Sequence, residues 1–315
     1  MSTLKITLEN KYKYIDIDGK LIVPGGIQII DCSHNKLTSL VAPKGLKELY
    51  CSDNNLTSLI VPKGIQKLCC SDNNLTSLIV PKGIQKLYCS GNKLTSLTVH
   101  EGIQKLYCYN NKLTSLDISE GIQELYCYNN LLTCLKVPEG IQILNCSNNK
   151  LTHLDIPDGI QELYCSDNKL TCLKVPNGIR KLWCSYNKLT CLKVPEGMQA
   201  LWCYNNKLTY IDFKTPKKLK RLSIFDNKEL VYPPKEYHSK STEEIIKYCT
   251  SHKIPQRLRL PKRWKKRWNV IRLVYVAHYT NNGDLDSAES HAPNFNFNVI
   301  PIEVITGIIV RYILT

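Results

Sequence analysis

The 315-residue sequence has little of several features that define common protein classes. Its 15 glycines and 15 prolines are too few for a collagen-like or linker-like chain. It has no uncharged apolar run of about 18 residues, the length that spans a bilayer, because Pro301, Glu303 and Arg311 interrupt the longest candidate, residues 299–315. Its charged, tyrosine-rich N-terminus contains no signal-peptide core. We therefore expect no membrane contact and an intracellular, cytoplasmic protein whose cysteines stay reduced.

Motifs for catalysis and for metal or nucleotide binding are also missing. The chain has no G-x-S-x-G, no H-E-x-x-H and no glycine-rich phosphate loop. Its seven histidines are scattered, and no C-x-x-C pair supplies the close ligands of a zinc site. The sequence therefore predicts a protein that is not an enzyme, with no catalytic residues, no metal site and no cofactor.

What the sequence has in abundance is cysteine, with 15 residues, most of which belong to a repeat. Units such as GIQKLCCSDNNLTSLIVPK (residues 64–82) follow one another every 19 residues without an insertion. The repeat cysteines are Cys32, Cys51, Cys70, Cys89, Cys108, Cys127, Cys146, Cys165, Cys184 and Cys203. An asparagine follows each of them three residues later: Asn35, Asn54, Asn73, Asn92, Asn111, Asn130, Asn149, Asn168, Asn187 and Asn206. A degraded eleventh unit at residues 219–230 keeps Asn227 but has Ile224 in place of cysteine.

The physical character of one unit predicts its conformation. Leu68 and Cys70 alternate with polar neighbours, which is the pattern of a short strand with one buried face. The asparagine turns the chain out of the strand, and its amide can satisfy backbone groups between stacked units. The following segment is too short and too close to Pro81 to form a full helix. Because one coil cannot bury its own apolar edge, the units must stack into a parallel sheet.

The pattern Ile65-x-x-Leu68-x-Cys70-x-x-Asn73-x-Leu75 resembles the signature of the leucine-rich repeat family, with cysteine in the third apolar slot. The resemblance covers about residues 20–230. It is greatest to short-repeat members with an L-x-C-S-x-N-x-L-T-S-L core, found in large DNA viruses of amoebae and in bacteria. It implies a leucine-rich repeat solenoid, or horseshoe, with a curved parallel β-sheet on the concave face and an extended convex side with few helices. A viral origin would place the protein in the host cell.

The sequence predicts three regions along the chain. Residues 1–20 form an N-terminal cap of two short strands, LKITL and KYIDID, and residues 21–230 form a solenoid of about eleven coils. Residues 231–315 form a small α/β C-terminal cap. A helix is expected in this cap from Ser241 to about His252, because Ser241 is followed by Glu243, Glu244 and apolar residues.

The exposed strand position before each repeat cysteine is rich in aromatic residues, with lysines two residues upstream in several coils. Rigid aromatic rings give a large contact area at low entropic cost and are enriched at binding hot spots. The same rings can instead stack on one another and stiffen the sheet. The predicted partner-binding residues are Tyr50, Tyr88, Tyr107, Tyr126, Tyr164, Trp183, Trp202, Lys67, Lys86 and Lys105.

Most of the formal net charge of +15 comes from the C-terminal part of the chain. The density of basic residues is highest in residues 254–268. Basic residues with interleaved tryptophans suit phosphate contacts and base stacking, although a solvated basic face that covers the last coil is the alternative. The segment contains Arg257, Arg259, Lys262, Arg263, Trp264, Lys265, Lys266, Arg267 and Trp268.

The repeat cysteines are expected to fill a narrow core slot that leucine would overfill, rather than to bind metal or to form disulfides. Cys172 with Cys191, or Cys69 with Cys70, could bridge under oxidation.

The function predicted from the sequence is a non-catalytic scaffold that binds a protein partner of unknown identity through its concave aromatic face. The alternatives are a nucleic-acid-associated protein that uses residues 254–268 and a spacer that only displays its tail.

Overall fold

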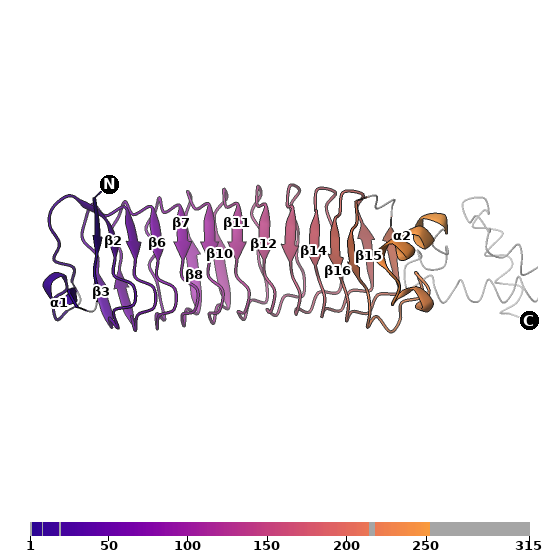
Figure 1. Ribbon diagram of the computed structural model, residues 1–315, viewed down its shortest axis with the longest axis horizontal. Helices are drawn as coiled ribbons and strands as arrows, with labels where there is room; N and C mark the ends of the chain where they lie inside the picture. The colour runs from indigo at the N-terminus through magenta and orange to yellow at the C-terminus, as the bar shows by residue number, and fades with distance from the viewer. Residues whose placement is uncertain (1, 8, 19, 214–217, 253–315) are drawn as a thin grey trace, which may run out of the picture. The chain divides into compact units, whose positions relative to one another are not determined.

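The structure is a computed structural model that describes residues 2–7, 9–18, 20–213 and 218–252. The described chain winds into a stack of coils, and each coil adds one strand to a 12-stranded parallel sheet, the long sheet (Figure 1). Its strands, in spatial order, are β1 (Ser2–Lys5), β2 (Ile27–Asp31), β4 (Glu48–Tyr50), β6 (Lys67–Cys69), β7 (Lys86–Tyr88), β9 (Lys105–Tyr107), β11 (Glu124–Tyr126), β12 (Ile143–Asn145), β13 (Glu162–Tyr164), β14 (Lys181–Trp183), β16 (Ala200–Trp202) and β18 (Arg221–Ser223).

The strands pair so that equivalent repeat positions lie side by side. Leu125 is opposite Leu106 on one side and Leu144 on the other. The pairing of Ala200 with Arg221 brings the degraded eleventh unit into the same sheet. Each repeat position therefore forms a column that runs along the stack, with a spacing of about 4.7–4.9 Å between neighbouring members.

The core is built from the inward-facing residues of each strand and from apolar residues of the segment that returns along the opposite side of the coil. Leu68, Cys70 and Leu75 have no solvent exposure, and Val80 is 5% exposed. No single coil could bury these side chains, so the stacking of neighbours supplies the hydrophobic stabilisation.

The return side of the coils is extended. It forms three two-stranded parallel ladders, and no helix lies between Ile27 and Phe213, a range that the structure describes throughout. The expected extended side with few helices is confirmed. The strands of these ladders are β3 (Ser39–Val41) with β5 (Ser58–Ile60), β8 (Ser96–Val99) with β10 (Ser115–Ile118), and β15 (Cys191–Val194) with β17 (Tyr210–Phe213).

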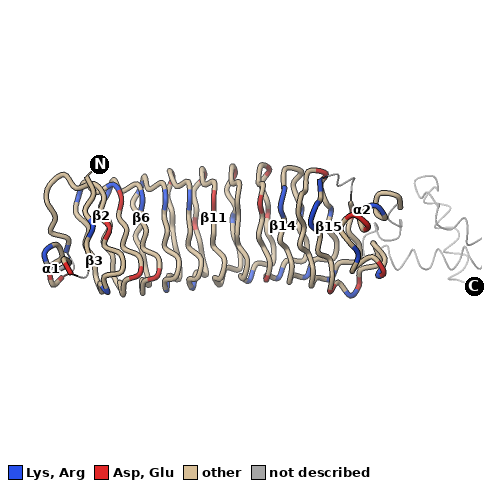
Figure 2. Tube along the Cα trace, in the orientation of Figure 1, with Lys and Arg blue, Asp and Glu red and all other residues tan. Residues whose placement is uncertain are grey.

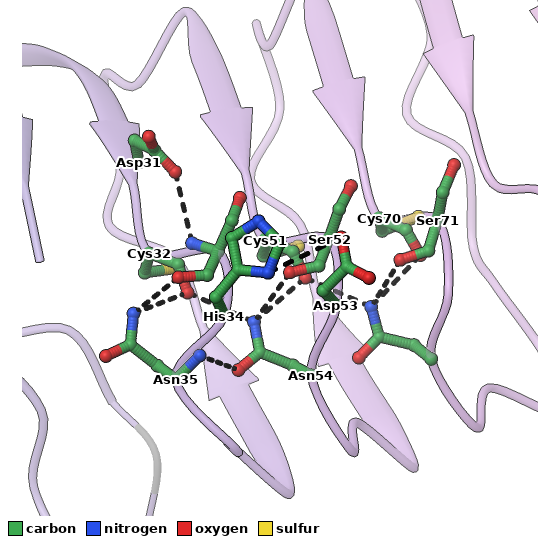
Figure 3. A network of polar contacts seen from close by, with 12 residues as sticks. Asp31, Cys32, His34, Asn35, Cys51, Ser52, Asp53, Asn54, Cys70 and Ser71 are labelled. Atoms are coloured by element: carbon green, nitrogen blue, oxygen red, sulfur yellow. Dashed lines mark hydrogen bonds and ion pairs between the residues drawn. The ribbon is translucent and has the colours of Figure 1, made fainter. Parts of the chain in front are cut away.

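The repeat asparagines connect neighbouring coils through a column of buried amides. The Nδ2 group of Asn73 donates to the carbonyl oxygens of Cys70 (3.2 Å) and Ser71 (3.1 Å) in its own coil, and of Cys51 (3.0 Å) in the preceding coil. Its Oδ1 atom accepts a 2.9 Å hydrogen bond from the backbone N–H of Leu56. Figure 3 shows the same arrangement at Asn54, whose amide points toward the carbonyl groups beside it. The amide thus satisfies backbone groups that the turn leaves unpaired.

The residue before each amide sits in a tight turn with a left-handed backbone. The φ angle is 53° at Asn129 and 54° at Asp167. Asparagine, aspartate and glycine adopt this conformation more easily than other residues. This preference explains why these types occupy the position in most coils.

The N-terminal cap differs from the prediction in one of its two strands. A first strand is present as β1, which pairs in parallel with β2, but it spans Ser2–Lys5 and shares only Leu4 and Lys5 with the predicted LKITL. The second is wrong, because the chain instead forms the short helix α1 (Lys11–Tyr14) and a single antiparallel bridge between Ile15 and Leu21. The reason is a side-chain turn: Asp16 Oδ1 accepts hydrogen bonds from the backbone N–H groups of Asp18 (3.0 Å) and Lys20 (2.8 Å). That turn ends the extended conformation which the alternating residues suggest.

Beyond the last coil lie a 3₁₀ turn, η1 (Lys235–Tyr237), and the helix α2 (Thr242–Ser251), which confirms the helix expected there. Ser241 and Glu244 form a reciprocal capping box at its start. Ile245 and Cys249 are buried, and Tyr232 donates a 3.1 Å hydrogen bond to the carbonyl oxygen of Cys249. The hydrogen bond joins the helix to Tyr232, which follows the last solenoid coil.

Candidate partner-binding surface

The outward face of the long sheet carries two columns of side chains, which we name by their chemistry. The ring column is the position immediately before each repeat cysteine, and the charge column lies two residues upstream of it. Alternation along each strand brings both columns to the same face, opposite the buried leucines. The aromatic members of the ring column are all half-buried: Tyr50, Tyr88, Tyr107, Tyr126, Tyr164, Trp183 and Trp202.

The rings of the last coils stack face to face. The ring centroids of Tyr164 and Trp183 are 4.3 Å apart with an interplanar angle of 12°. Those of Trp183 and Trp202 are 4.2 Å apart with an angle of 8°. The spacing of adjacent strands imposes this contact, because it is close to the centroid separation at which aromatic rings pack against each other.

The middle coils contain a second group of rings with a different geometry. Tyr107 lies 4.9 Å from Tyr88 at 68° and 4.5 Å from Tyr126 at 51°. Cys69 and Asn145 interrupt the column on either side of this group. The structure thus brings the predicted aromatic residues together in two contiguous groups, and Tyr50 lies beyond Cys69.

The charge column is ordered by ion pairs between neighbouring strands. Lys105 Nζ lies 2.7 Å from Glu124 Oε1, and Lys181 Nζ lies 2.8 Å from Glu162 Oε1. Figure 2 marks basic residues on β6 and β14 and an acidic residue on β11, and in the charge column these are Lys67, Lys181 and Glu124. The predicted lysines therefore lie on one surface, where Lys67 and Lys105 have partners within the chain. Lys86 lies between them on β7.

Hydrogen bonds join the two columns to each other. The hydroxyl of Tyr107 donates to Glu124 Oε2 at 3.1 Å, and that of Tyr164 donates to Glu162 Oε2 at 2.9 Å. Burial raises the pKa of both tyrosines, and the neighbouring carboxylates raise it further. Burial would also raise the pKa of Glu162, but the hydrogen bonds from Lys181 and Tyr164 outweigh it and lower that pKa. The tyrosines are therefore neutral donors and Glu162 is an anion at neutral pH.

A further set of rings follows the strands, at the edge of the same face. Tyr109 and Tyr128 stack with 4.4 Å between centroids at 6°, while Tyr186 and Tyr204 meet edge to face at 5.3 Å. The sequence patterns did not single out Phe225, although its ring stacks on that of Tyr204 with 4.5 Å between centroids and an interplanar angle of 9°. Its position two residues before Asn227 could have revealed it, because Tyr204 precedes Asn206 by the same interval.

The cysteines divide into a buried column and a few exposed residues. The ten repeat cysteines are buried and free, and burial raises the pKa of their thiols, to about 12 at Cys89 and Cys146. Cys134, Cys172 and Cys191 are exposed and also free. Among the residues that the structure describes, no group of three or more His, Cys, Asp or Glu side chains could hold a metal ion.

The predicted basic segment, residues 254–268, lies outside the described residues. It contains all nine members of the predicted nucleic-acid patch, from Arg257 to Trp268. Its role therefore stays a prediction. Within the described part of the chain, no helix is long and apolar enough to cross a bilayer.

Comparisons with known proteins bear on the fold. The family model described as Leucine Rich Repeat matches residues 45–68. Among solved structures, YopM from Yersinia enterocolitica WA-314 aligns with a TM-score of 0.54 and 22% identity, over 67% of this chain and 59% of YopM. The fold is that of a leucine-rich repeat solenoid. The part of YopM that this chain spans is only 59% of the YopM chain.

Two further structures share the leucine-rich repeat fold. YopM from Yersinia pestis, described as a leucine-rich effector protein, has a TM-score of 0.51 and 21% identity over 68% of this chain and 76% of its own. The leucine-rich repeat domain of APL1B has a TM-score of 0.54 and 19% identity over 73% of this chain and 83% of its own. A search of curated protein sequences finds no match to this chain. These similarities establish the architecture, and a fold by itself does not specify a function.

Proposed function

We propose that this leucine-rich repeat solenoid is a non-catalytic scaffold that binds a protein partner through the outward face of its long sheet. The fold is commonly used for protein interactions, which supports a binding role in general terms. The observation that supports this particular face is its ring column, in which seven aromatic side chains lie half-buried on one sheet.

The rings are held in place before any partner arrives. Trp183 is stacked on both sides, and the hydroxyl groups of Tyr107 and Tyr164 are bound to carboxylates. A side chain that is already ordered loses little conformational entropy on binding, so more of the contact energy contributes to affinity. Stacking within the column is thus compatible with binding, since the rings still expose an edge to a partner.

The test is a comparison of two forms of the full-length protein in affinity capture from cells that contain the natural partner. One form is the wild type, and the other carries Tyr107→Ala, Tyr126→Ala and Trp183→Ala together. We expect the captured partner to be lost from the triple variant while its circular dichroism spectrum stays that of the wild type. Undiminished capture by a folded triple variant would show that another surface binds.

A matched control changes exposed residues on the return side of the coils. Thr133→Ala, Thr152→Ala and Thr171→Ala together alter three exposed positions in consecutive coils. This variant should capture the partner as well as the wild type does. The difference between the two triple variants assigns the binding to one face of the solenoid.

A further inference from the structure

The ring column is interrupted twice, and the first interruption shows what occupies such a gap. On β6 the column position is Cys69, which leaves Tyr50 and Tyr88 as the nearest rings on either side. The ammonium group of Lys67 lies 4.7 Å from the centre of the Tyr50 ring and 6.0 Å from that of Tyr88. It also donates a 2.8 Å hydrogen bond to the Tyr50 hydroxyl. At this gap, a cation supplied by the chain itself therefore interacts with both flanking rings.

The second interruption has the same rings but lacks the cation. On β12 the column position is Asn145, between Tyr126 on β11 and Tyr164 on β13. Asn145 Oδ1 accepts a 3.2 Å hydrogen bond from the backbone N–H of Ser147, so the side chain is turned toward its own backbone. The charge-column position of this coil is Ile143, where the coil of β6 has Lys67. The flanking strands are two strand spacings apart, about 9.5 Å, as they are at the first gap.

The charges around the second gap favour a cation there. The charge column reads Lys105, Glu124, Ile143, Glu162 and Lys181 on five successive strands. Each glutamate is paired with the lysine on its far side, at 2.7 and 2.8 Å, and faces the uncharged Ile143 on its near side. A positive charge beside Ile143 would complete an alternating row of five charges. Both carboxylates keep some solvent exposure, 22% for Glu124 and 25% for Glu162, so the position is accessible from outside.

We propose that the gap between Tyr126 and Tyr164 receives a cationic side chain, lysine or arginine, from the bound partner. The site consists of these two rings, the carboxylates of Glu124 and Glu162, and the apolar surface of Ile143. The part of the proposal that concerns a partner rests on the proposed function, whereas the affinity of the site for a cation does not.

The experiment measures binding of a small cation to the full-length protein. The probe is N-acetyl-arginine amide, and its neutral isostere, N-acetyl-citrulline amide, is the control. The readout is the Ile143 δ1-methyl signal in a protein with labelled isoleucine methyl groups, assigned by its disappearance in Ile143→Val. We expect the arginine probe to shift this signal in a saturable manner and the citrulline probe to leave it in place.

Variants test each part of the site. Tyr126→Leu should weaken probe binding about two- to fivefold, the usual size of one exposed cation–π contact. Glu124→Gln with Glu162→Gln should weaken it further and remove its dependence on salt. The two variants at position 143 lack the reporter methyl group, so their probe binding is read from the ring signals of Tyr126 and Tyr164 in a protein with labelled tyrosine. Ile143→Lys should abolish probe binding by supplying the cation from within the chain, as Lys67 does on β6. Ile143→Gln, which is similar in length but neutral, should still bind the probe.

Three results would overturn the proposal: equal shifts with arginine and citrulline, no shift with either, or equal binding by Ile143→Lys and Ile143→Gln. Denaturation midpoints close to that of the wild type would show that these variants are folded. If the probe fails while ring substitutions still abolish partner capture, the cation site is wrong and the proposed function stands. If the probe binds but ring substitutions leave partner capture intact, the proposed function and the partner's use of the site are both wrong.

Discussion

The indole rings of Trp183 and Trp202 lie parallel, 4.2 Å apart, on adjacent strands of the long sheet. Tyr164 continues the stack on the other side of Trp183. The contact follows from the in-register pairing of Trp183 with Trp202, because residues one repeat apart cannot avoid each other at strand spacing. The rings thus pack against one another within the sheet, and this contribution to stability can be measured separately from the proposed binding of a partner.

The first prediction concerns stability. Trp183 has an aromatic neighbour on both sides, whereas Trp202 has Ser223 on its far side. We expect Trp183→Ala to destabilise the protein more than Trp202→Ala by about 0.5–1.5 kcal/mol, the usual contribution of one aromatic pair. Urea denaturation of the two variants measures the difference. Equal losses would mean that the stacks add nothing beyond burial.

The second prediction concerns the amide column. The side chain of Asn130 makes three hydrogen bonds to carbonyl oxygens and accepts one from the N–H of Leu113 at 2.9 Å. Asn130→Ala leaves these buried groups unpaired, so it should lower the free energy of unfolding by at least about 3 kcal/mol. Asn55→Ala, at an exposed asparagine, should change it by less than about 0.5 kcal/mol. A small loss for Asn130→Ala in the same denaturation assay would contradict a role in coil stacking.

The third prediction concerns thiol reactivity. Cys134, Cys172 and Cys191 are exposed, whereas the other cysteines are buried except for half-buried Cys69. Burial raises the pKa of Cys69 to about 11, so little of the reactive thiolate is present there at neutral pH. A maleimide should therefore label three thiols rapidly in the folded protein and all 15 in urea, as counted by intact mass. Rapid labelling of a variant with alanine at all three exposed positions would show that maleimide reaches the buried repeat cysteines.

The fourth prediction concerns alkaline pH. An unfolded thiol ionises near pH 8.5, whereas burial raises the pKa of Cys146 to about 12. The folded state therefore holds its proton above pH 8.5 and the unfolded state loses it. The stability that results from this difference in pKa between the folded and unfolded states is fully present below about pH 8.5. It falls as the pH rises toward 12.

The slope of that loss can be assigned to single thiols. Well above pH 8.5, each buried thiol should reduce the free energy of unfolding by about 1.4 kcal/mol per pH unit. Cys146→Ala should make the loss of stability shallower when it is measured by denaturation between pH 7.5 and 8.5, where unfolded thiols begin to ionise, while Cys172→Ala should leave that loss unchanged. Identical slopes for wild type and Cys146→Ala would show that the thiol ionises as readily in the folded protein.

Much of the architecture was predictable because the repeat constrains every coil in the same way. Leu68 and Cys70 alternate with polar residues, and the 19-residue step places Asn54 and Asn73 in one column. The cap was less predictable, since residues 13–18 alternate like a strand but turn where Asp16 binds the backbone of Lys20. That hydrogen bond depends on local geometry that alternation does not encode.

For the outward face of the long sheet, the sequence determined which residue types share a column, because a fixed repeat length in a parallel stack leaves equivalent positions no other arrangement. It could not decide how their side chains meet. Only the tertiary structure showed that Trp183 stacks face to face while Tyr107 is tilted, and that Lys67 crosses from the charge column to the rings of Tyr50 and Tyr88. These contacts depend on rotamers and on neighbours 17–21 residues away, and such distant side chains come within a few ångströms only when the coils stack.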